Sequence, residues 1–167
     1  IFKISFAVLA LFFMQSCGKA EEAEEAPIEA HLSNSDPKTT KLRYEVEDKT
    51  SWEVVYVSSD NVKERAVKAI DNNPNTIWHS QSKPKRVKYP HEIHIDMGKE
   101  LNIHGFSYLA RSRGMSGVIK KYEFYISNDP KNWGKAVYQG EFDAAKLSQG
   151  QSVSSFDTAV KGRYFRF

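Results

Sequence analysis

The chain has 167 residues, of which 40% are hydrophobic, and its net charge at pH 7 is +3. This length corresponds to about one domain once terminal tails are set aside. A single cysteine excludes disulfides within the chain, and the mild positive charge comes without any motif that supports nucleic-acid binding.

Residues 1–17 indicate a bacterial lipoprotein signal peptide. Lys3 precedes an unbroken apolar run from Phe6 to Met14, and Cys17 follows shortly after that run. Nine apolar residues fit the core of a signal peptide and are too few to span a bilayer core of about 30 Å. Met14 and Ser16 resemble the positions of a lipobox, which predicts lipidation of Cys17 and a membrane anchor. An ordinary signal peptide and a buried N-terminal strand are the alternatives.

Residues 18–48 indicate a solvated tether. Gly18 to Ala30 carries five glutamates against Lys19, a net charge of −4, and such a dense run of like charge cannot bury itself. It resembles the surface-export signal of Bacteroidetes lipoproteins, which implies an outer-membrane, cell-surface location; a plain spacer is the alternative. Removing the tether's −4 and the +1 of Lys3 from the chain's +3 leaves +6 for residues 31–167, which favours anionic partners.

From Ser51 onward, the sequence alternates in the manner of β-strands. In "HEIHIDMG", Ile93, Ile95 and Met97 share one face. Similar segments separated by turn clusters are "SWEVVYVSS", "LNIHGFSYLAR", "IKKYEFYISND", "KAVYQGEF", "SVSSFD" and "RYFRF". Only "VKERAVKAI" has a helical pattern, and it is short. The series predicts an all-β antiparallel sandwich or jelly roll.

The sequence ends on the aromatic strand of "KGRYFRF", with no turn after it. Such a strand needs pairing on both sides or a closing strand after it. We therefore expect that residues 49–167 form one domain whose C-terminal strand region is incomplete.

The loop "AIDNNPNTIWHSQ", residues 69–81, is rich in oxygen donors. The donors are the carboxylate of Asp71, the side-chain amides of Asn72, Asn73 and Asn75, and the hydroxyl of Thr76. Hard oxygen donors on a tight turn suit Ca²⁺, which takes six to eight of them, and asparagine tolerates the left-handed backbone that such a turn needs. A plain Asx-turn without an ion is the alternative. The spacing of an EF-hand is absent.

Four blocks of sequence occur in a characteristic order. They are "KAIDNNPNTIWHSQ", "YPHEIHIDMGKELNIHGFSYLARSRG", "GVIKKYEFYISNDPKNWGKAVYQGEF" and "GRYFRF". Together they resemble the discoidin superfamily, the coagulation factor 5/8 type C domain, and within it carbohydrate-binding module family 32. The first block matches the family pattern A-[IV]-D-G-[DN]-x-x-T-x-W-H, with Asn72 where glycine is usual. The resemblance covers about Ser51 to Phe167 and implies an eight-stranded jelly roll of the galactose-binding-domain type.

The resemblance also implies a structural Ca²⁺ beside the ligand edge. Carried over by register, its ligands are the Lys68 carbonyl, the Asp71 carboxylate, Asn73, and the hydroxyl and carbonyl of Thr76. The family adds a glutamate and a carbonyl from its final strand, and this sequence has no matching segment. Trp78 is expected to pack in the core beside the ion.

Sugar-binding members of the family use a histidine after the tryptophan and an arginine in a Y-x-P-R segment. These positions match His79 and, in "YLARSRG", Arg111, with Arg113 as an adjacent cation. A histidine can donate to and accept from vicinal hydroxyls, and an arginine fork holds two oxygens at once. No aromatic residue follows His79 in "SQS", so the stacking platform is not identified. A hydrogen-bonded structural histidine and a surface salt bridge are the alternatives.

Two further patterns have ordinary explanations. Glu92, His94 and Asp96 share one strand face and mimic a metal triad, but alternate residues lie about 6.6–7 Å apart, and the family pattern P-H-x-I-x-I-D-x-G assigns them to the sheet surface. The basic run "KPKRVK" contains Lys83, Lys85, Arg86 and Lys88. It suits anionic glycans or lipid headgroups, or forms a solvated loop. Motifs of serine hydrolases, zinc peptidases and phosphate-binding loops do not occur.

The sequence therefore predicts non-catalytic glycan binding by a lipid-anchored surface protein. Terminal galactose and N-acetylhexosamine-type sugars are the expected partners. A second hypothesis is an accessory module of a larger glycoside hydrolase or glycan-directed peptidase. A third is adhesion to protein or lipid, which the charged and small polar loop tips do not favour. Part of this prediction is fold-level analogy.

Overall fold

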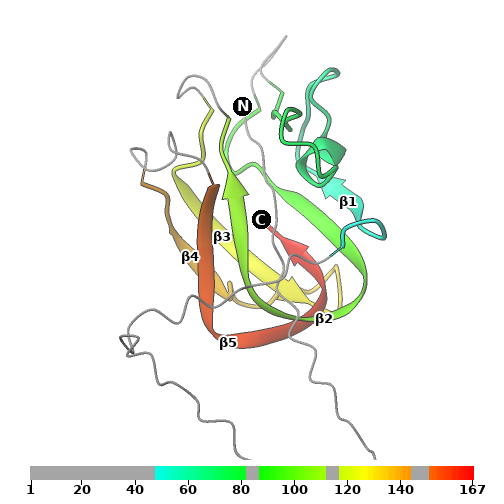
Figure 1. The fold of residues 1–167 in the computed structure, drawn as a ribbon, viewed down its shortest axis with the longest axis vertical. Coiled ribbons are helices and arrows are strands. Elements are labelled where there is room, and N and C mark those ends of the chain that lie inside the picture. Colours follow the sequence, from blue (N-terminus) through cyan, green and yellow to red (C-terminus); the bar gives the residue numbers. More distant parts are fainter. Residues whose placement is uncertain (1–47, 82–86, 112–116, 144–150) are drawn as a thin grey trace, which may run out of the picture.

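The computed structural model describes residues 48–81, 87–111, 117–143 and 151–167. The predicted signal peptide with Cys17, nearly all of the tether, Arg113 and most of the basic run lie outside these residues. The described strands are β1 (Glu53–Val57), β2 (Ile93–Leu109), β3 (Lys121–Ser127), β4 (Tyr138–Glu141) and β5 (Gln151–Arg166). They form one antiparallel sheet in the order β1-β2-β5-β3-β4 (Figure 1). The prediction of an all-β fold is confirmed.

The two long strands, β2 and β5, each combine two segments that the sequence pattern separates. They pair with each other along most of their length, with register shifts between Asp96 and Leu101 and again between Ile103 and Gly105. At the second shift the strands approach closely, because a Cβ atom on Gly105 would lie 2.2 Å from the carbonyl oxygen of Ser154. Bulges of this kind bend a strand, and Figure 1 shows β2 curling so that both of its ends reach the top of the view.

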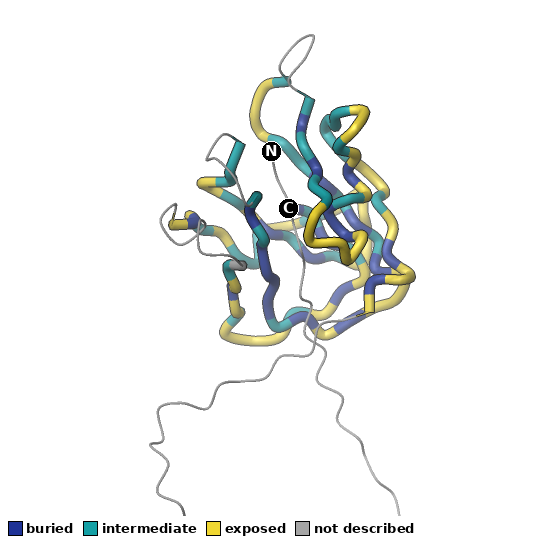
Figure 2. Tube along the Cα trace, turned by 45° about the horizontal axis from the view of Figure 1, so that its top comes forward, coloured by how far each residue is buried: buried dark blue, intermediate teal, exposed yellow. Residues whose placement is uncertain are grey.

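This curling makes the sheet enclose its own core. Ile93, Ile95 and Met97 are fully buried, which confirms the face predicted from the alternation in "HEIHIDMG". Phe106 and Phe124 stack within the core with ring centroids 4.5 Å apart. Figure 2 shows the buried residues following the strands, while the exposed residues gather in the turns and loops. The result is a two-layered, jelly-roll arrangement.

The final strand is central in the sheet. β5 pairs with β2 on one side and with β3 on the other, and Phe167 exchanges two backbone hydrogen bonds with Ile93, at 3.0 and 3.1 Å. Pairing on both sides is the first of the two conditions that the sequence pattern set for an aromatic final strand. The expectation of an incomplete C-terminal region stays a prediction.

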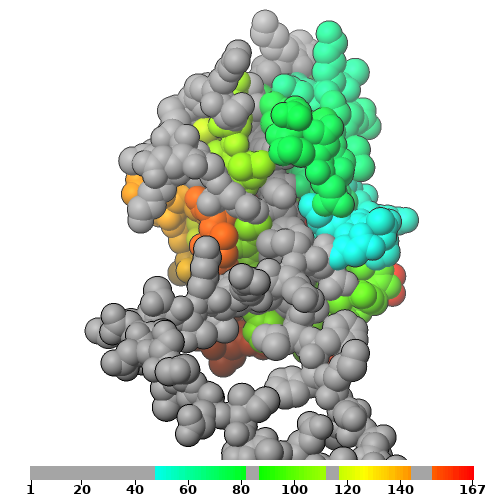
Figure 3. Space-filling view, in the orientation of Figure 1, coloured from blue at the N-terminus to red at the C-terminus, as the bar shows by residue number. Residues whose placement is uncertain are grey.

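Helical structure is confined, within the described residues, to one short 3-10 turn, η1 (Ala66–Ala69). It occupies part of "VKERAVKAI" and buries Ala66 and Ala69. In the described ranges, no helix has the length and apolar character required to cross a membrane. The segment from η1 to Gln81 forms an exposed lobe at the upper right of the molecule in Figure 3.

Candidate functional site

The donor-rich loop after η1 is closed by its own hydrogen bonds. The Thr76 hydroxyl donates to the Asp71 carboxylate at 2.5 Å and lies 3.1 Å from the Asn73 carbonyl oxygen. The backbone N–H of Asn73 donates to Asp71 Oδ1 at 3.0 Å. Asn72 has φ 58°, the left-handed conformation that explains why glycine suits this position. The loop therefore brings together three of the predicted metal-ligating residues.

The chemical type of the donors in this loop suits a calcium ion. Asp71, Asn73 and Thr76 supply only oxygen donors, and these converge at an exposed turn, as Ca²⁺ requires. Lys68 lies in η1 and its ammonium group donates to the Lys63 carbonyl at 2.7 Å, so any role at an ion falls to its backbone carbonyl. Four residues supply fewer oxygens than the six to eight that Ca²⁺ takes, so water or further ligands would have to complete the shell.

Trp78 anchors the loop to the core. Its side chain is buried, with 2% exposure, and its indole N–H donates to the Ser59 carbonyl at 3.1 Å. A buried tryptophan whose N–H has a partner is a stable core element. The prediction that Trp78 packs in the core is confirmed.

His79 is held by its backbone at the edge of this lobe. Its N–H donates to the Glu64 carbonyl at 3.0 Å, and its carbonyl accepts from the Asn61 N–H at 2.9 Å. The ring Nδ1 contacts the Ser80 carbonyl. Because a carbonyl only accepts, this contact suits the tautomer with the proton on Nδ1, in which Nε2 is the acceptor. The half-buried ring thus has an acceptor nitrogen that suits a hydroxyl donor.

Arg111 follows the last residues of β2 and is half-buried. Because β2 curls, its start and its end lie at the same end of the domain (Figure 1). This geometry places Arg111 at the loop end that also carries the segment leading into β2. Arg113, the other predicted cation, lies outside the described residues, and of the four basic side chains in "KPKRVK" the structure describes Lys88, which is exposed.

The face with Glu92, His94 and Asp96 is a sheet surface, as the sequence analysis expected. Asp96 is bound by Arg163 of β5 through two hydrogen bonds of 2.8 Å, and this interaction lowers the pKa of Asp96. His94 lies 3.3 Å from the Glu92 carboxylate, and burial lowers the pKa of His94. Across the described residues, no three His, Cys, Asp or Glu side chains gather as a metal site.

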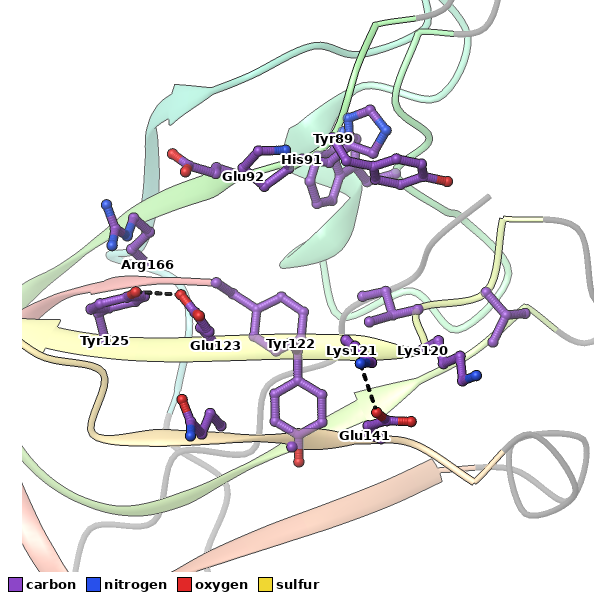
Figure 4. A pocket seen from close by; sticks show the side chains of 17 residues that line it. Tyr89, His91, Glu92, Lys120, Lys121, Tyr122, Glu123, Tyr125, Glu141 and Arg166 are labelled. Carbon is purple, nitrogen blue, oxygen red and sulfur yellow. Dashed lines mark hydrogen bonds and ion pairs between the residues drawn. The ribbon is translucent and has the colours of Figure 1, made fainter.

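A cavity of about 910 Å³ opens between the start of β2 and the start of β3. Its walls are Tyr89–Glu92 on one side and Lys120–Glu123 on the other (Figure 4), and Phe167 also lines it. Lys121 forms an ion pair with Glu141 at 3.2 Å, and the Tyr125 hydroxyl donates to Glu123. Lys121 and Glu123 of the lower wall therefore have polar partners in this part of the sheet.

Tyr89 belongs to none of the candidate site residues predicted from the sequence, although it is 72% exposed. Both the family pattern and the strand alternation in "YPHEIHIDMG" begin after this tyrosine. One feature of the sequence could have indicated that Tyr89 is exposed: it lies directly before a proline and outside the alternating strand. A large ring at this position does not fall on the buried face of that strand.

The curled antiparallel sheet, with its donor-rich loop at one end, defines an all-β jelly roll with a loop-edge site. A family model, the F5/8 type C domain, matches residues 50–167. The chain belongs to this family.

Several proteins are similar to this chain. A galactose oxidase of Gibberella zeae is 35% identical over 120 residues, which are 71% of this chain and 17% of the oxidase. A sialidase of Micromonospora viridifaciens is 34% identical over 86 residues, which are 51% of this chain and 13% of the sialidase. The chain thus spans less than a fifth of each of these relatives.

Solved structures of family 32 carbohydrate-binding modules have the same fold. A module of a family 31 glycoside hydrolase from Clostridium perfringens has a TM-score of 0.63 and 26% identity, covering 72% of this chain and 78% of the module. Another C. perfringens module, solved in complex with GalNAc-β-1,3-galactose, has a TM-score of 0.61 and 26% identity, covering 71% of this chain and 83% of the module.

Proposed function

We propose that this domain binds glycans without transforming them, and that terminal galactose and N-acetylhexosamine-type sugars are its ligands. The observation that carries the proposal is what the relatives share. The galactose oxidase, the sialidase and a blood-group N-acetyl-galactosamine deacetylase of Flavonifractor plautii differ in chemistry, and each matches this chain over 8–17% of its length. A segment shared by enzymes of different reactions suits a binding module better than a catalytic one.

The proposed contacts use the two residues at the loop end. His79 presents Nε2 as an acceptor for one sugar hydroxyl, because Nδ1 is engaged by the Ser80 carbonyl. Arg111 supplies two parallel N–H donors for a pair of neighbouring oxygens, and Arg113, two residues further along the sequence, is proposed as an additional cation. Complementary donors and acceptors of this kind orient a sugar in its site. The affinity for the sugar also depends on apolar contact between the ligand and the protein.

We further propose that Ca²⁺ bound by the Lys68 carbonyl, Asp71, Asn73 and Thr76 fixes the loop that carries His79. The ion would supply rigidity and take no part in a reaction. The support is the convergence of oxygens around the hydroxyl of Thr76, which lies two residues before Trp78 and three before His79 in the same loop.

The sequence in front of the domain motivates a proposal on location. Lipidation of Cys17 and an acidic tether over residues 18–48 would present the domain at the cell surface of a bacterium. Sites of this shallow kind are weak one at a time, and a tethered display supplies avidity by multivalency. The second hypothesis, a module of a larger glycan-active enzyme, is favoured by the small share of the relatives that this chain matches.

A glycan array tests the proposed function. The full chain would be screened with Ca²⁺ and with a chelator, beside the variants His79→Ala and Arg111→Ala. We expect binding to galactose- or N-acetylhexosamine-terminated glycans that both variants lose. A folded protein that binds none of the glycans would contradict the proposal and direct attention to protein or lipid partners.

A further inference from the structure

Tyr89 is the most exposed aromatic residue in the described ranges. It is 72% exposed, and Tyr56, at 48%, is the other described aromatic residue above one third. A single exposed tyrosine is common on protein surfaces. The question is therefore whether the position and support of this ring distinguish it from a surface residue without a role.

The ring of Tyr89 is supported from one side. Its centroid lies 4.8 Å from the centroid of His91, at an interplanar angle of 60°, and Pro90 restricts the backbone of the residue before it. Figure 4 shows Tyr89 and His91 together on the upper wall of the cavity. A braced ring with an open face loses little conformational entropy when a ligand stacks on it.

Tyr89 belongs to the same loop cluster as His79. The N–H of Val87 donates to the Gln81 carbonyl at 3.4 Å, so Tyr89 and His79 each lie two residues from this hydrogen bond. The neighbouring serines Ser58 and Ser59 bind both segments. The Ser59 hydroxyl accepts from the Gln81 N–H at 3.1 Å, and Ser58 shares two hydrogen bonds of 2.9 Å with Glu92.

The cavity gives an independent link between the two segments. Trp78, the residue before His79, lines the same cavity as Tyr89. Arg111 lies at the same end of the domain, because both ends of β2 reach it (Figure 1). An exposed aromatic face, an acceptor nitrogen and an arginine fork therefore occur together at one loop end.

The other exposed tyrosine has a different setting. Tyr56 is paired in register with His94 on the sheet between β1 and β2. Its ring lies 4.5 Å from the His94 ring, and His94 also contacts Trp133 at 4.9 Å. Tyr56 thus belongs to a cluster on the sheet surface. The two tyrosines resemble each other in exposure and in having a histidine neighbour, which makes Tyr56 a matched control.

We propose that Tyr89 is the stacking platform of the glycan site. Its ring would pack against the apolar C–H face of a galactose-type pyranose, whose axial hydroxyl leaves one face free of polar groups. His79 and Arg111 would hold hydroxyls at the opposite edge. This inference rests on the proposed function, and it assigns the aromatic residue that the sequence alone left unidentified.

The experiment compares affinities for GalNAc-β-1,3-galactose by titration calorimetry of the full chain, with far-UV circular dichroism as the folding check. Tyr89→Ala is expected to weaken binding by about tenfold or more, since it removes the aromatic surface. Tyr89→Phe keeps the ring and should bind within about threefold of the wild type. Tyr56→Ala should bind like the wild type.

The outcomes separate this inference from the proposed function. If the wild type binds and His79→Ala abolishes binding, but Tyr89→Ala binds normally, the platform is elsewhere and only this inference is wrong. Equal losses in Tyr89→Ala and Tyr56→Ala would also overturn it. If the wild-type chain binds no galactose-type glycan, both proposals fail.

Discussion

The hydroxyl of Thr76 and the carboxylate of Asp71 meet at 2.5 Å across the loop that precedes Trp78. This contact closes a turn in which Asn72 has φ 58° and the Asn73 carbonyl lies 3.1 Å from the same hydroxyl. Three oxygen donors from separate residues are thereby gathered at one point. Their arrangement links the stability of the loop to the position of His79 three residues further along the chain.

We expect Ca²⁺ to stabilise the domain through this loop. A ligand present at a hundred times its dissociation constant adds about 2.7 kcal/mol to the free energy of unfolding. Thermal unfolding in Ca²⁺ and in a chelator measures the effect, and Asp71→Asn should remove most of the difference. The control is Asp129→Asn, because the Asp129 carboxylate accepts the Lys131 N–H at 2.9 Å in a turn elsewhere in the fold. An unchanged Ca²⁺ response in Asp71→Asn would refute the ion site.

The backbone at Asn72 sets the second prediction. A left-handed φ of 58° costs a β-branched residue about 1–2 kcal/mol and costs glycine little. Asn72→Val should therefore lower the free energy of unfolding by that amount, and Asn72→Gly should be neutral or stabilising. Denaturant titration measures both. Asn75→Val, two residues beyond Asn73 in the same exposed turn, is the control and should cost less; an equal cost would show that side-chain loss, not φ, is responsible.

The Arg163–Asp96 pair predicts a loss of stability in acid. Arg163 holds the pKa of Asp96 below its ordinary value of 3.8. The unfolded chain then binds the proton more readily, so this contribution is present above the ordinary pKa and is lost as pH falls through the lowered pKa. Arg163→Gln should lower the free energy of unfolding at neutral pH by a small amount, since Arg163 is half exposed and water screens the pair.

The difference between wild type and Arg163→Gln should shrink as pH falls below 3.8, the ordinary pKa of Asp96. Urea unfolding at a series of pH values measures it. Arg65→Gln is the matched control, because Arg65 contacts Asp60 at 3.2 Å and is 61% exposed. It should cost less. A pH-independent penalty in Arg163→Gln would mean that packing, and not the charge pair, is lost.

His94 predicts a second pH dependence with the same sign. Burial lowers its pKa from the ordinary 6.5, while its ring packs between Tyr56 and Trp133. The unfolded chain takes up the proton first as pH falls, so stability is full above about pH 6.5 and declines as pH falls toward the lowered pKa. His94→Gln should flatten the stability curve between neutral pH and pH 5. A wild-type curve that rises on acidification would contradict the assignment.

Part of this structure could be predicted from local pattern. The buried face of Ile93, Ile95 and Met97 follows from period-two alternation, and the core position of Trp78 follows from the family pattern. The fusion of separate segments into β2 and β5 could not be predicted, because the bulges that bend these strands depend on register with a partner strand far along the chain.

The site shows the same division. Oxygen donors crowded between Asp71 and Thr76 are visible in the sequence, and the loop does bring them together. Tyr89 was not identified, because exposure depends on tertiary packing and the residue lies outside any alternating segment. The partner of Asp96 was also unpredictable, since Arg163 is 67 residues away in sequence. Local sequence patterns carry no information on which distant residues pair in the folded chain.

The most direct test of the account is a calorimetric titration of the full chain with GalNAc-β-1,3-galactose in Ca²⁺, for the wild type, His79→Ala, Arg111→Ala and the exposed-cation control Lys135→Ala. We predict measurable binding by the wild type and the control, and a loss of about tenfold or more in each of the two site variants. Binding that survives both site substitutions, or a folded wild type that does not bind, would contradict the assignment of a glycan site to this end of the domain.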